Sequence, residues 1–357
     1  MDSALQVKLV QAEVQRLLNK KAITLEDPVE GQFISSLFLI PKKSGELRPI
    51  VNLRPLNKFV LYQHFKMEGI NLVKDLLNQG DYLGSIDLKD AYLTVPIHTE
   101  HRKYLRFLWQ DRLFQFACLP FGLSSAPRTF TKVLKPAVAH LRQMGIRCVF
   151  YLDDILILGK TSEECKENLN TAANLLQKLG FLINYDKSVF VPSHQLTYLG
   201  FLINSSTMTL ALPMEKVNKI VEHCQSVLQA KNLTVRDLAR LLGRLSSSIQ
   251  AVFPAPLFYR NLQQDKVIAL HRENSYESEA VLSPASRVEL ETWISCIRVW
   301  NGQTLLNPTP DLTIQTDASL QGWGACLGNM QCRGRWSLEE QSLHINHLEL
   351  LAVFYAL

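Results

Sequence analysis

The tetrapeptide Tyr151-Leu152-Asp153-Asp154 lies within an apolar run, residues 146–158, that is otherwise interrupted only by Arg147. Apolar runs of this kind are typical of strands buried on both faces of a sheet. Two adjacent carboxylates in such a run repel each other and resist desolvation. A hairpin turn would account for them, because Asp is a common turn residue. Bound Mg²⁺ or Mn²⁺ would also account for them, since these cations prefer oxygen ligands.

A third carboxylate occurs upstream, in the stretch Ser85-Ile86-Asp87-Leu88-Lys89-Asp90-Ala91-Tyr92. An isolated Asp-x-x-Asp pattern is more often an exposed turn than a site. Combined with the downstream Tyr-Leu-Asp-Asp, it resembles motifs A and C of reverse transcriptases. The resemblance implies that Asp87, Asp153 and Asp154 are catalytic and bind two Mg²⁺, or Mn²⁺, for phosphoryl transfer.

The resemblance extends to segments that would bind a nucleotide. The sequence Pro41-Lys42-Lys43-Ser44-Gly45-Glu46-Leu47-Arg48-Pro49 is similar to the fingertip hairpin of this family. That similarity implies that Lys43 and Arg48 bind the β- and γ-phosphates, as cationic donors do. Taken alone, the segment is also compatible with a solvated hairpin turn.

The sugar and base would meet residues of motifs A and B. In the family, the aromatic residue at the position of Tyr92 packs beneath the sugar and excludes a 2′-hydroxyl, while the backbone of Asp90 and Ala91 holds the triphosphate. Without the motif, Tyr92 would be interpreted as a core aromatic. Phe121 and Gly122 belong to a segment resembling motif B, which cradles nucleotide and template. Many retroviral enzymes carry Gln in place of this Phe, whereas Gypsy-like and DIRS-like enzymes carry Phe.

Two further segments resemble motifs D and E. In the first, Phe181-Leu182-Ile183-Asn184-Tyr185-Asp186-Lys187-Ser188, Lys187 is a candidate general acid for the pyrophosphate leaving group. A solvated surface lysine is the alternative. The second, Tyr198-Leu199-Gly200-Phe201-Leu202-Ile203, resembles the hairpin that grips the primer terminus.

Composition sets broader limits. The 357 residues are 47% apolar and 20% charged, which predicts a globular chain with more than one subdomain. A net charge of +5 permits a polyanionic partner. The sequence has no apolar stretch of about 18 residues and no secretory signal. Its seven cysteines include no C-x-x-C pair. We therefore expect reduced thiols, no membrane association, and an intracellular protein of the cytoplasm or nucleus.

The C-terminal segment resembles the beginning of an RNase H domain. Asp317 precedes small residues and a Gly-rich return, and Glu349 lies near the start of an apolar helix. The resemblance implies that these two belong to a set of about four metal-binding carboxylates in that family. Only these two are present, so we expect no RNA cleavage by this chain.

The resemblance implies an α+β fold of the right-hand polymerase type, with an antiparallel palm sheet and helices on one side. The expected fingers are residues 1–80, with a contribution from residues 93–118, followed by a palm at 81–205. A thumb at 206–262 carries seven Lys or Arg and three Asp or Glu. A connection at 263–310 and a partial RNase H-like segment at 311–357 complete the chain.

The predicted function is that of an RNA-directed DNA polymerase from a retrotransposon polyprotein. Its partners would be an RNA template, a DNA primer, the RNA–DNA hybrid and dNTPs. An RNA-templated RNA polymerase and a DNA-repair polymerase are alternatives within the same chemistry. An inactive retroelement relic, or a fragment that only binds nucleic acid, is the alternative outside it. The sequence leaves the host, the priming mechanism, the retroelement branch and the oligomeric state open.

Overall fold

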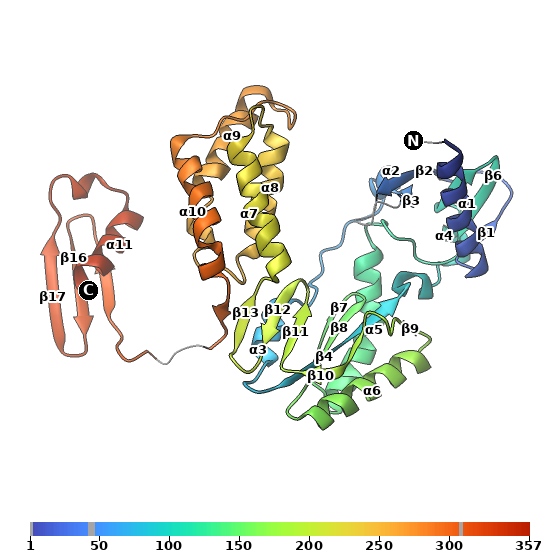
Figure 1. Ribbon diagram of the computed structural model, residues 1–357, viewed down its shortest axis with the longest axis horizontal. Helices are drawn as coiled ribbons and strands as arrows, with labels where there is room; N and C mark the ends of the chain where they lie inside the picture. Colours follow the sequence, from blue (N-terminus) through green and yellow to red (C-terminus); the bar gives the residue numbers. More distant parts are fainter. Residues whose placement is uncertain (1–2, 42–46, 307–309) are drawn as a thin grey trace. The chain divides into compact units, whose positions relative to one another are not determined.

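The computed structural model describes residues 3–41, 47–306 and 310–357, and the side chains at 3–5, 41, 47 and 48 are excluded. The chain forms two compact units, Met1–Leu305 and Leu306–Leu357 (Figure 1). Lys43 lies outside the described residues. Arg48 lies on a described strand, but its side chain is also outside them. Within the described ranges, no helix combines the length and apolar character needed to cross a bilayer.

An antiparallel sheet at the centre of the larger unit carries the acidic motifs. Its strand order is β10-β4-β8-β7, and a short strand, β9, pairs with the end of β4. The strands are β4 (Tyr82–Lys89), β7 (Cys148–Tyr151), β8 (Asp154–Gly159), β9 (Leu182–Ile183) and β10 (Val189–Ser193). The apolar run around Asp153 and Asp154 therefore forms a hairpin of two buried strands, as its composition predicts.

Both faces of this sheet are buried. Ile155 and Ile157 on β8 pack into the core that contains helices α5 (Ala126–Gln143) and α6 (Ser162–Lys178). The alternate residues Leu156 and Leu158 pack into a second core on the opposite face. That core includes residues of helix α3 (Ile70–Leu76) and of strands from a second, smaller sheet (Figure 1). The expected helical layer on one side is therefore joined by a mixed layer on the other.

The N-terminal part forms a five-stranded sheet with the order β1-β6-β5-β2-β3. Helix α1 (Ser3–Asn19) buries Val10, Val14 and Leu17 against it. The strands are β1 (Ile23–Leu25), β2 (Ile34–Pro41), β3 (Leu47–Asn52), β5 (Arg106–Trp109) and β6 (Arg112–Phe116). Short helical turns flank this sheet: α2 (Arg54–Asn57), η1 (Ala91–Thr94) and α4 (Thr99–Arg102). Strands from before and after the first acidic motif thus share one sheet.

A smaller antiparallel sheet leads into a helical region. Its strands are β11 (Gln195–Tyr198), β12 (Phe201–Asn204), β13 (Thr209–Ala211) and β14 (Gln303–Thr304). The helices that come after β13 are α7 (Met214–Gln229), α8 (Val235–Ser248), η2 (Ala255–Leu257), α9 (Arg260–Glu273) and α10 (Pro284–Trp300).

The structure corrects the predicted boundary at residue 262. Helix α10 packs into the same apolar core as α7 and α8, with Trp293 fully buried there. The indole of Trp293 also donates a hydrogen bond of 2.7 Å to the carbonyl of Phe258. Strand β14 then returns to pair with β13. Most of the expected connection, residues 263–310, is therefore part of the helical region rather than a separate linker.

The C-terminal unit is a three-stranded antiparallel sheet and a helix. Strands β15 (Gln315–Ala318), β16 (Gly322–Leu327) and β17 (Met330–Arg335) pair in sequence order. After the turn η3 (Glu340–Ser342), helix α11 (Ile345–Ala356) covers β15 and β16. Its buried Leu348 and Ala352 cluster with Trp336.

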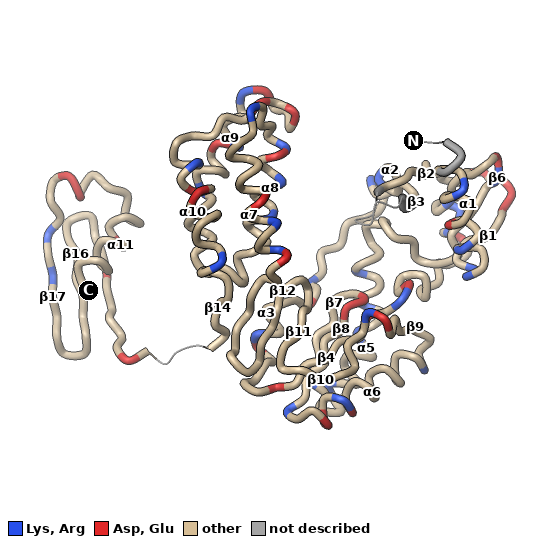
Figure 2. The backbone as a smooth tube through the Cα atoms, in the orientation of Figure 1, with Lys and Arg blue, Asp and Glu red and all other residues tan. Residues whose placement is uncertain are grey.

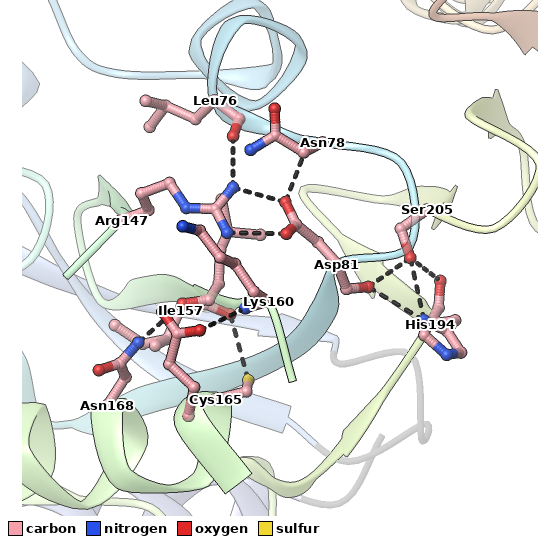
Figure 3. A network of polar contacts seen from close by, with 12 residues as sticks. Leu76, Asn78, Asp81, Arg147, Ile157, Lys160, Cys165, Asn168, His194 and Ser205 are labelled. Atoms are coloured by element: carbon pink, nitrogen blue, oxygen red, sulfur yellow. Dashed lines mark hydrogen bonds and ion pairs between the residues drawn. The ribbon is translucent and has the colours of Figure 1, made fainter. Parts of the chain in front are cut away.

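A buried ion pair ties together the starts of two central-sheet strands, β4 and β7, and the main chain of the same aspartate contacts the smaller sheet. The Asp81 side chain, only 2% exposed, accepts hydrogen bonds of 2.6 and 2.7 Å from the Arg147 guanidinium (Figure 3). Arg147 also donates to the carbonyl of Leu76 at 3.0 Å. The Asp81 carbonyl accepts a hydrogen bond from the Ser205 hydroxyl and lies 3.2 Å from His194 Nδ1. Arg147, the lone cation of the apolar run, therefore has a structural partner.

We expect Arg147→Met to lower the free energy of unfolding by about 3 kcal/mol, because it leaves the buried Asp81 carboxylate without its cation. The control is Arg240→Met. Arg240 pairs with Asp237 at 3.2 Å on the surface of α8, and we expect a change below about 0.5 kcal/mol. Urea denaturation followed by tryptophan fluorescence measures both. Equal effects of the two substitutions would contradict a special role for the buried pair.

Candidate active site

The β7–β8 hairpin presents Asp153 and Asp154 at its turn. Tyr151 pairs with Asp154 across the hairpin, so Leu152 and Asp153 form a two-residue connection. Leu152 has a φ of 57°, in the left-handed region. That conformation costs a non-glycine residue on the order of 1 kcal/mol and persists where surrounding packing enforces it. Here the enforcing element is the pair of buried strands on either side of the turn.

Asp87 lies directly opposite this turn. It is the cross-strand partner of Asp154 in the β4–β8 register. Directly opposed residues of an antiparallel pair project from the same face of the sheet. The backbone N–H of Leu88 donates a hydrogen bond of 2.9 Å to the Asp153 carbonyl, which holds the turn against β4. The structure therefore brings Asp87 next to the adjacent pair Asp153 and Asp154, from which it is distant in the sequence.

The three carboxylates interact electrostatically. Partial burial raises the pKa of Asp154 to about 6, with additional repulsion from Asp153 and Asp87. Partial burial also raises the pKa of Asp153, to which Asp87 contributes. The ammonium of Lys187 opposes both shifts. The site is thus a concentration of negative charge that its nearby lysine offsets only in part.

The donor set fits a hard divalent cation. All three side chains offer oxygen ligands, which suit Mg²⁺ and Mn²⁺. In the parts of the chain that the structure describes, no group of three or more His, Cys, Asp or Glu side chains forms a ready-made metal cage. Mg²⁺ usually takes one or two carboxylates and completes its shell with water and substrate phosphates. The residues therefore fit ions that are completed by a bound triphosphate.

Tyr92 lies beside these carboxylates. Its ring is 5.0 Å from that of Phe121 and 5.2 Å from that of Phe130, between ring centroids. Burial raises its pKa to about 12, and the charge of Asp153 adds to the effect. The carbonyl of Gly122 accepts a hydrogen bond of 2.9 Å from the Asn57 amide. The structure therefore brings Tyr92 and the motif B aromatic residue together next to the acidic turn.

Asp90 has its side chain engaged by helix α1. With a φ of 54°, it precedes the turn η1, and its carboxylate contacts Arg16 at 3.2 Å and also Lys20. Burial opposes ionisation of Asp90, but hydrogen bonds and charge from Lys20 and Arg16 outweigh it and lower the pKa. The neighbouring Ala91 is buried. The side chains of Asp90 and Ala91 are thus engaged or buried, so a ligand at these two residues would meet their backbone.

The other residues predicted from the sequence lie in two places. Lys187 is exposed on the turn after β9, near enough to lower the pKa values of Asp153 and Asp154. Asp317 is exposed on β15, and Glu349 is half-buried on α11. These last two belong to the C-terminal unit, where α11 packs on β15.

Two residues at the site were not predicted from the sequence. The amide of Asn184 donates a hydrogen bond of 2.8 Å to the Asp87 carboxylate. The buried hydroxyl of Tyr198 lies 3.1 Å from the carbonyls of both Val149 and Asp154, and so holds the β7–β8 hairpin from below. Asn184 gave no signal beyond its place after a short strand, and a Tyr in an apolar strand is typical of a core.

Comparison with known proteins supports one family. Residues 40–203 match the family model described as reverse transcriptase (RNA-dependent DNA polymerase). Residues 40–203 are a reverse transcriptase domain. The matched residues include Asp87, Asp153 and Asp154. They also include Tyr92 and the segment that carries Asn184 and Lys187.

Relatives of the reverse transcriptase domain occur in long polyproteins. The chain is 25% identical over 224 residues to the retrovirus-related Pol polyprotein from transposon 412 of Drosophila melanogaster, and 26% over 210 residues to the Transposon Tf2-3 polyprotein of Schizosaccharomyces pombe. It is 24% identical over 352 residues to the genome polyprotein of Petunia vein clearing virus. These alignments cover 61%, 59% and 92% of the chain, but only 17%, 15% and 15% of the respective polyproteins.

Solved structures confirm the predicted polymerase fold. The foamy viral protease-reverse transcriptase dRH in complex with double-stranded DNA aligns with 98% of this chain and 59% of its own, with a TM-score of 0.72 and 19% identity. The foamy viral protease-reverse transcriptase in complex with an RNA/DNA hybrid aligns with 100% of this chain and 46% of its own, with a TM-score of 0.71 and 18% identity. At this identity the likeness establishes the fold alone.

We expect Asp154→Asn to stabilise the metal-free protein above about pH 6. Folding raises the pKa of Asp154 from 3.8 to about 6, so the folded state disfavours its ionised form. This destabilisation is absent below pH 3.8, grows as the pH rises to about 6, and is complete above that. Thermal unfolding in EDTA across this range measures the difference between the two proteins. A difference that does not vary with pH would contradict the raised pKa.

Proposed function

We propose that this chain is an RNA-directed DNA polymerase that extends a primer 3′-hydroxyl with dNTPs on an RNA template. The observation that carries the proposal is the pairing of Asp87 with Asp154 across β4 and β8, with Asp153 at the adjoining turn. This arrangement lies within a reverse transcriptase domain and on the corresponding fold. We also propose a retrotransposon polyprotein as its source, and Phe121 favours a Gypsy-like or DIRS-like branch.

Asp87, Asp153 and Asp154 would hold two Mg²⁺, with Mn²⁺ as a substitute. When bound, the two ions activate the 3′-hydroxyl and neutralise charge on the triphosphate and the leaving group. The contribution of the protein is mainly positioning and electrostatics. The β4–β8 register sets Asp87 and Asp154 on one face of the sheet, with Asp153 at the adjoining turn, and the buried strands behind them keep this arrangement fixed.

The incoming nucleotide would lie over the turn that joins β4 to η1. We assign the backbone of Asp90 and Ala91 to the triphosphate, together with Lys43 and Arg48 on the basis of the family resemblance. Phe121 and Gly122 would border the base and template. Tyr92 would stack beneath the sugar, where its ring leaves no room for a 2′-hydroxyl.

Lys187 is proposed as the general acid for the pyrophosphate leaving group. Its ammonium is exposed, and it acts electrostatically on Asp153 and Asp154. A lysine at the surface of the site can transfer a proton directly to a departing phosphate oxygen.

The helical region would hold the template–primer duplex as the thumb. Lys and Arg residues are spaced along α7 and α8 (Figure 2). Cationic side chains of this kind bind phosphates irrespective of sequence. The β11–β12 hairpin would contact the primer end. The foamy viral structures, which contain double-stranded DNA or an RNA/DNA hybrid, make the same ligands reasonable here.

We further propose that the C-terminal unit belongs to an RNase H-like domain. Its three antiparallel strands are succeeded by a helix that packs on them. Asp317 on β15 and Glu349 on α11 would be acidic ligands of that second site.

We expect Asp153→Asn to lower primer extension by about 10³-fold or more, because it removes a ligand of ions that supply several kcal/mol of stabilisation. Extension of oligo(dT) on poly(rA) measures the rate, and a filter-binding assay should show that duplex binding survives. The control is Asp111→Asn, which removes a carboxylate from the exposed β5–β6 turn and should leave extension unchanged. Normal extension by the Asp153 variant would refute the metal assignment.

We expect Tyr92→Val to raise incorporation of ribonucleotides relative to deoxyribonucleotides by about 10-fold to 100-fold, since it opens the space beneath the sugar. Tyr92→Phe keeps the ring and its packing against Phe121, so it should retain the preference of the unmodified protein. Single-nucleotide extension with dTTP and with UTP gives both ratios. An unchanged ratio of ribonucleotide to deoxyribonucleotide incorporation in the Val variant would show that Tyr92 does not contact the sugar.

A further inference from the structure

We propose that Asn184 is a positioning residue for the Asp87 carboxylate, which it orients for cation binding while tying the Lys187 turn to the same site. The inference rests on the proposed polymerase function. It adds a residue that contacts neither nucleotide nor primer and acts through Asp87.

The contact is defined by two hydrogen bonds. Asn184 Nδ2 donates to Asp87 Oδ1 at 2.8 Å, and the Asn184 backbone N–H donates to the Asp87 carbonyl at 2.8 Å. The amide must turn its NH₂ group to this partner, because a carboxylate oxygen is an acceptor. Strand β9 fixes the approach, since Ile183 is the cross-strand partner of Leu88. The side chain and the main chain of Asn184 therefore both donate hydrogen bonds to Asp87.

Ser188 closes the turn around the same residue. Its hydroxyl accepts a hydrogen bond of 3.0 Å from the Asp87 backbone N–H and donates one of 2.7 Å to the Asn184 carbonyl. The backbone N–H of Lys187 approaches that carbonyl at 3.2 Å. The turn that carries Lys187 is therefore attached to Asp87 by hydrogen bonds at both of its ends.

Orientation matters because the protein supplies only part of the coordination shell. Within the described residues, Asn184 is the side chain that donates a hydrogen bond to the Asp87 carboxylate. Because the amide holds Oδ1, we assign Oδ2 to the cation. Groups that orient metal ligands in this way typically contribute 10-fold to 100-fold to metal affinity.

The test compares Asn184→Leu, which keeps the approximate volume but removes the donor, with Asn168→Leu. Asn168 is a matched control, because it is a half-buried amide of the same domain that donates to the Leu158 carbonyl at 3.0 Å from helix α6. Mn²⁺ binding is measured by electron paramagnetic resonance in a complex that cannot react, made with a dideoxy-terminated primer on an RNA template and the next dNTP.

We expect Asn184→Leu to weaken Mn²⁺ binding by about 10-fold or more and to raise the Mg²⁺ concentration for half-maximal extension. The extension rate at saturating Mg²⁺ should recover to within a few fold. Asn168→Leu should leave both metal measurements unchanged. Unaltered Mn²⁺ affinity in Asn184→Leu would overturn the inference, as would equal losses in the two variants.

Asn184→Ser guards against misfolding of the Leu variant, because Ser suits a turn and its hydroxyl is too short to reach Asp87 Oδ1. It should show the same loss of Mn²⁺ affinity, and normal affinity would again overturn the inference.

The failure of the positioning role can be distinguished from the failure of the proposed polymerase function. If the unmodified protein neither extends a primer nor binds Mn²⁺ in the complex, the polymerase function is wrong. If it does both and the Asn184 variants match it, only the positioning role is wrong.

Discussion

The pairing of β4 with β8 is the constraint on which the rest of the site depends. Its register sets Asp87 opposite Asp154, and a shift by one residue would send one carboxylate to the other face. The register is fixed because both faces are buried. Ile155 and Ile157 fill one core while Leu156 and Leu158 fill the other. The packing that fixes the pairing of β4 with β8 thereby also sets the positions of the carboxylates at the ends of these strands.

Around that pairing, supporting contacts come from segments distant in sequence. Asn184 and Ser188 bracket Asp87, the Tyr198 hydroxyl reaches the carbonyl of Asp154, and the cations of α1 hold Asp90. These contacts come from three separate segments: the turn between β9 and β10, strand β11 and helix α1. The acidic residues are therefore held by distant parts of the chain. Hydrogen bonds and packing hold the carboxylates close together, and the exposed Lys187 offsets part of their repulsion.

Local pattern and motif were enough to predict the fold and the acidic centre from the sequence. The apolar run around Asp153 and Asp154 is a buried hairpin, Asp87 lies beside it, and the polymerase fold is confirmed. The contact between Asn184 and Asp87 was not predicted, because a polar residue after a short strand gives no sign of its partner. The predicted end of the helical region, residue 262, is too early. The sequence after it is charged and only weakly periodic, so it gives no indication that Trp293 is buried in the same core.

The hydroxyl of Tyr198 has a consequence for how the catalytic centre keeps its spacing. Tyr198 ends β11, and its oxygen lies 3.1 Å from the main chain at Asp154 and Val149. The strand proposed to contact the primer end and the hairpin that carries the carboxylates therefore share a single anchor. In the proposed polymerase, a displacement of one would be transmitted to the other, so this anchor would keep their separation constant through successive rounds of nucleotide addition.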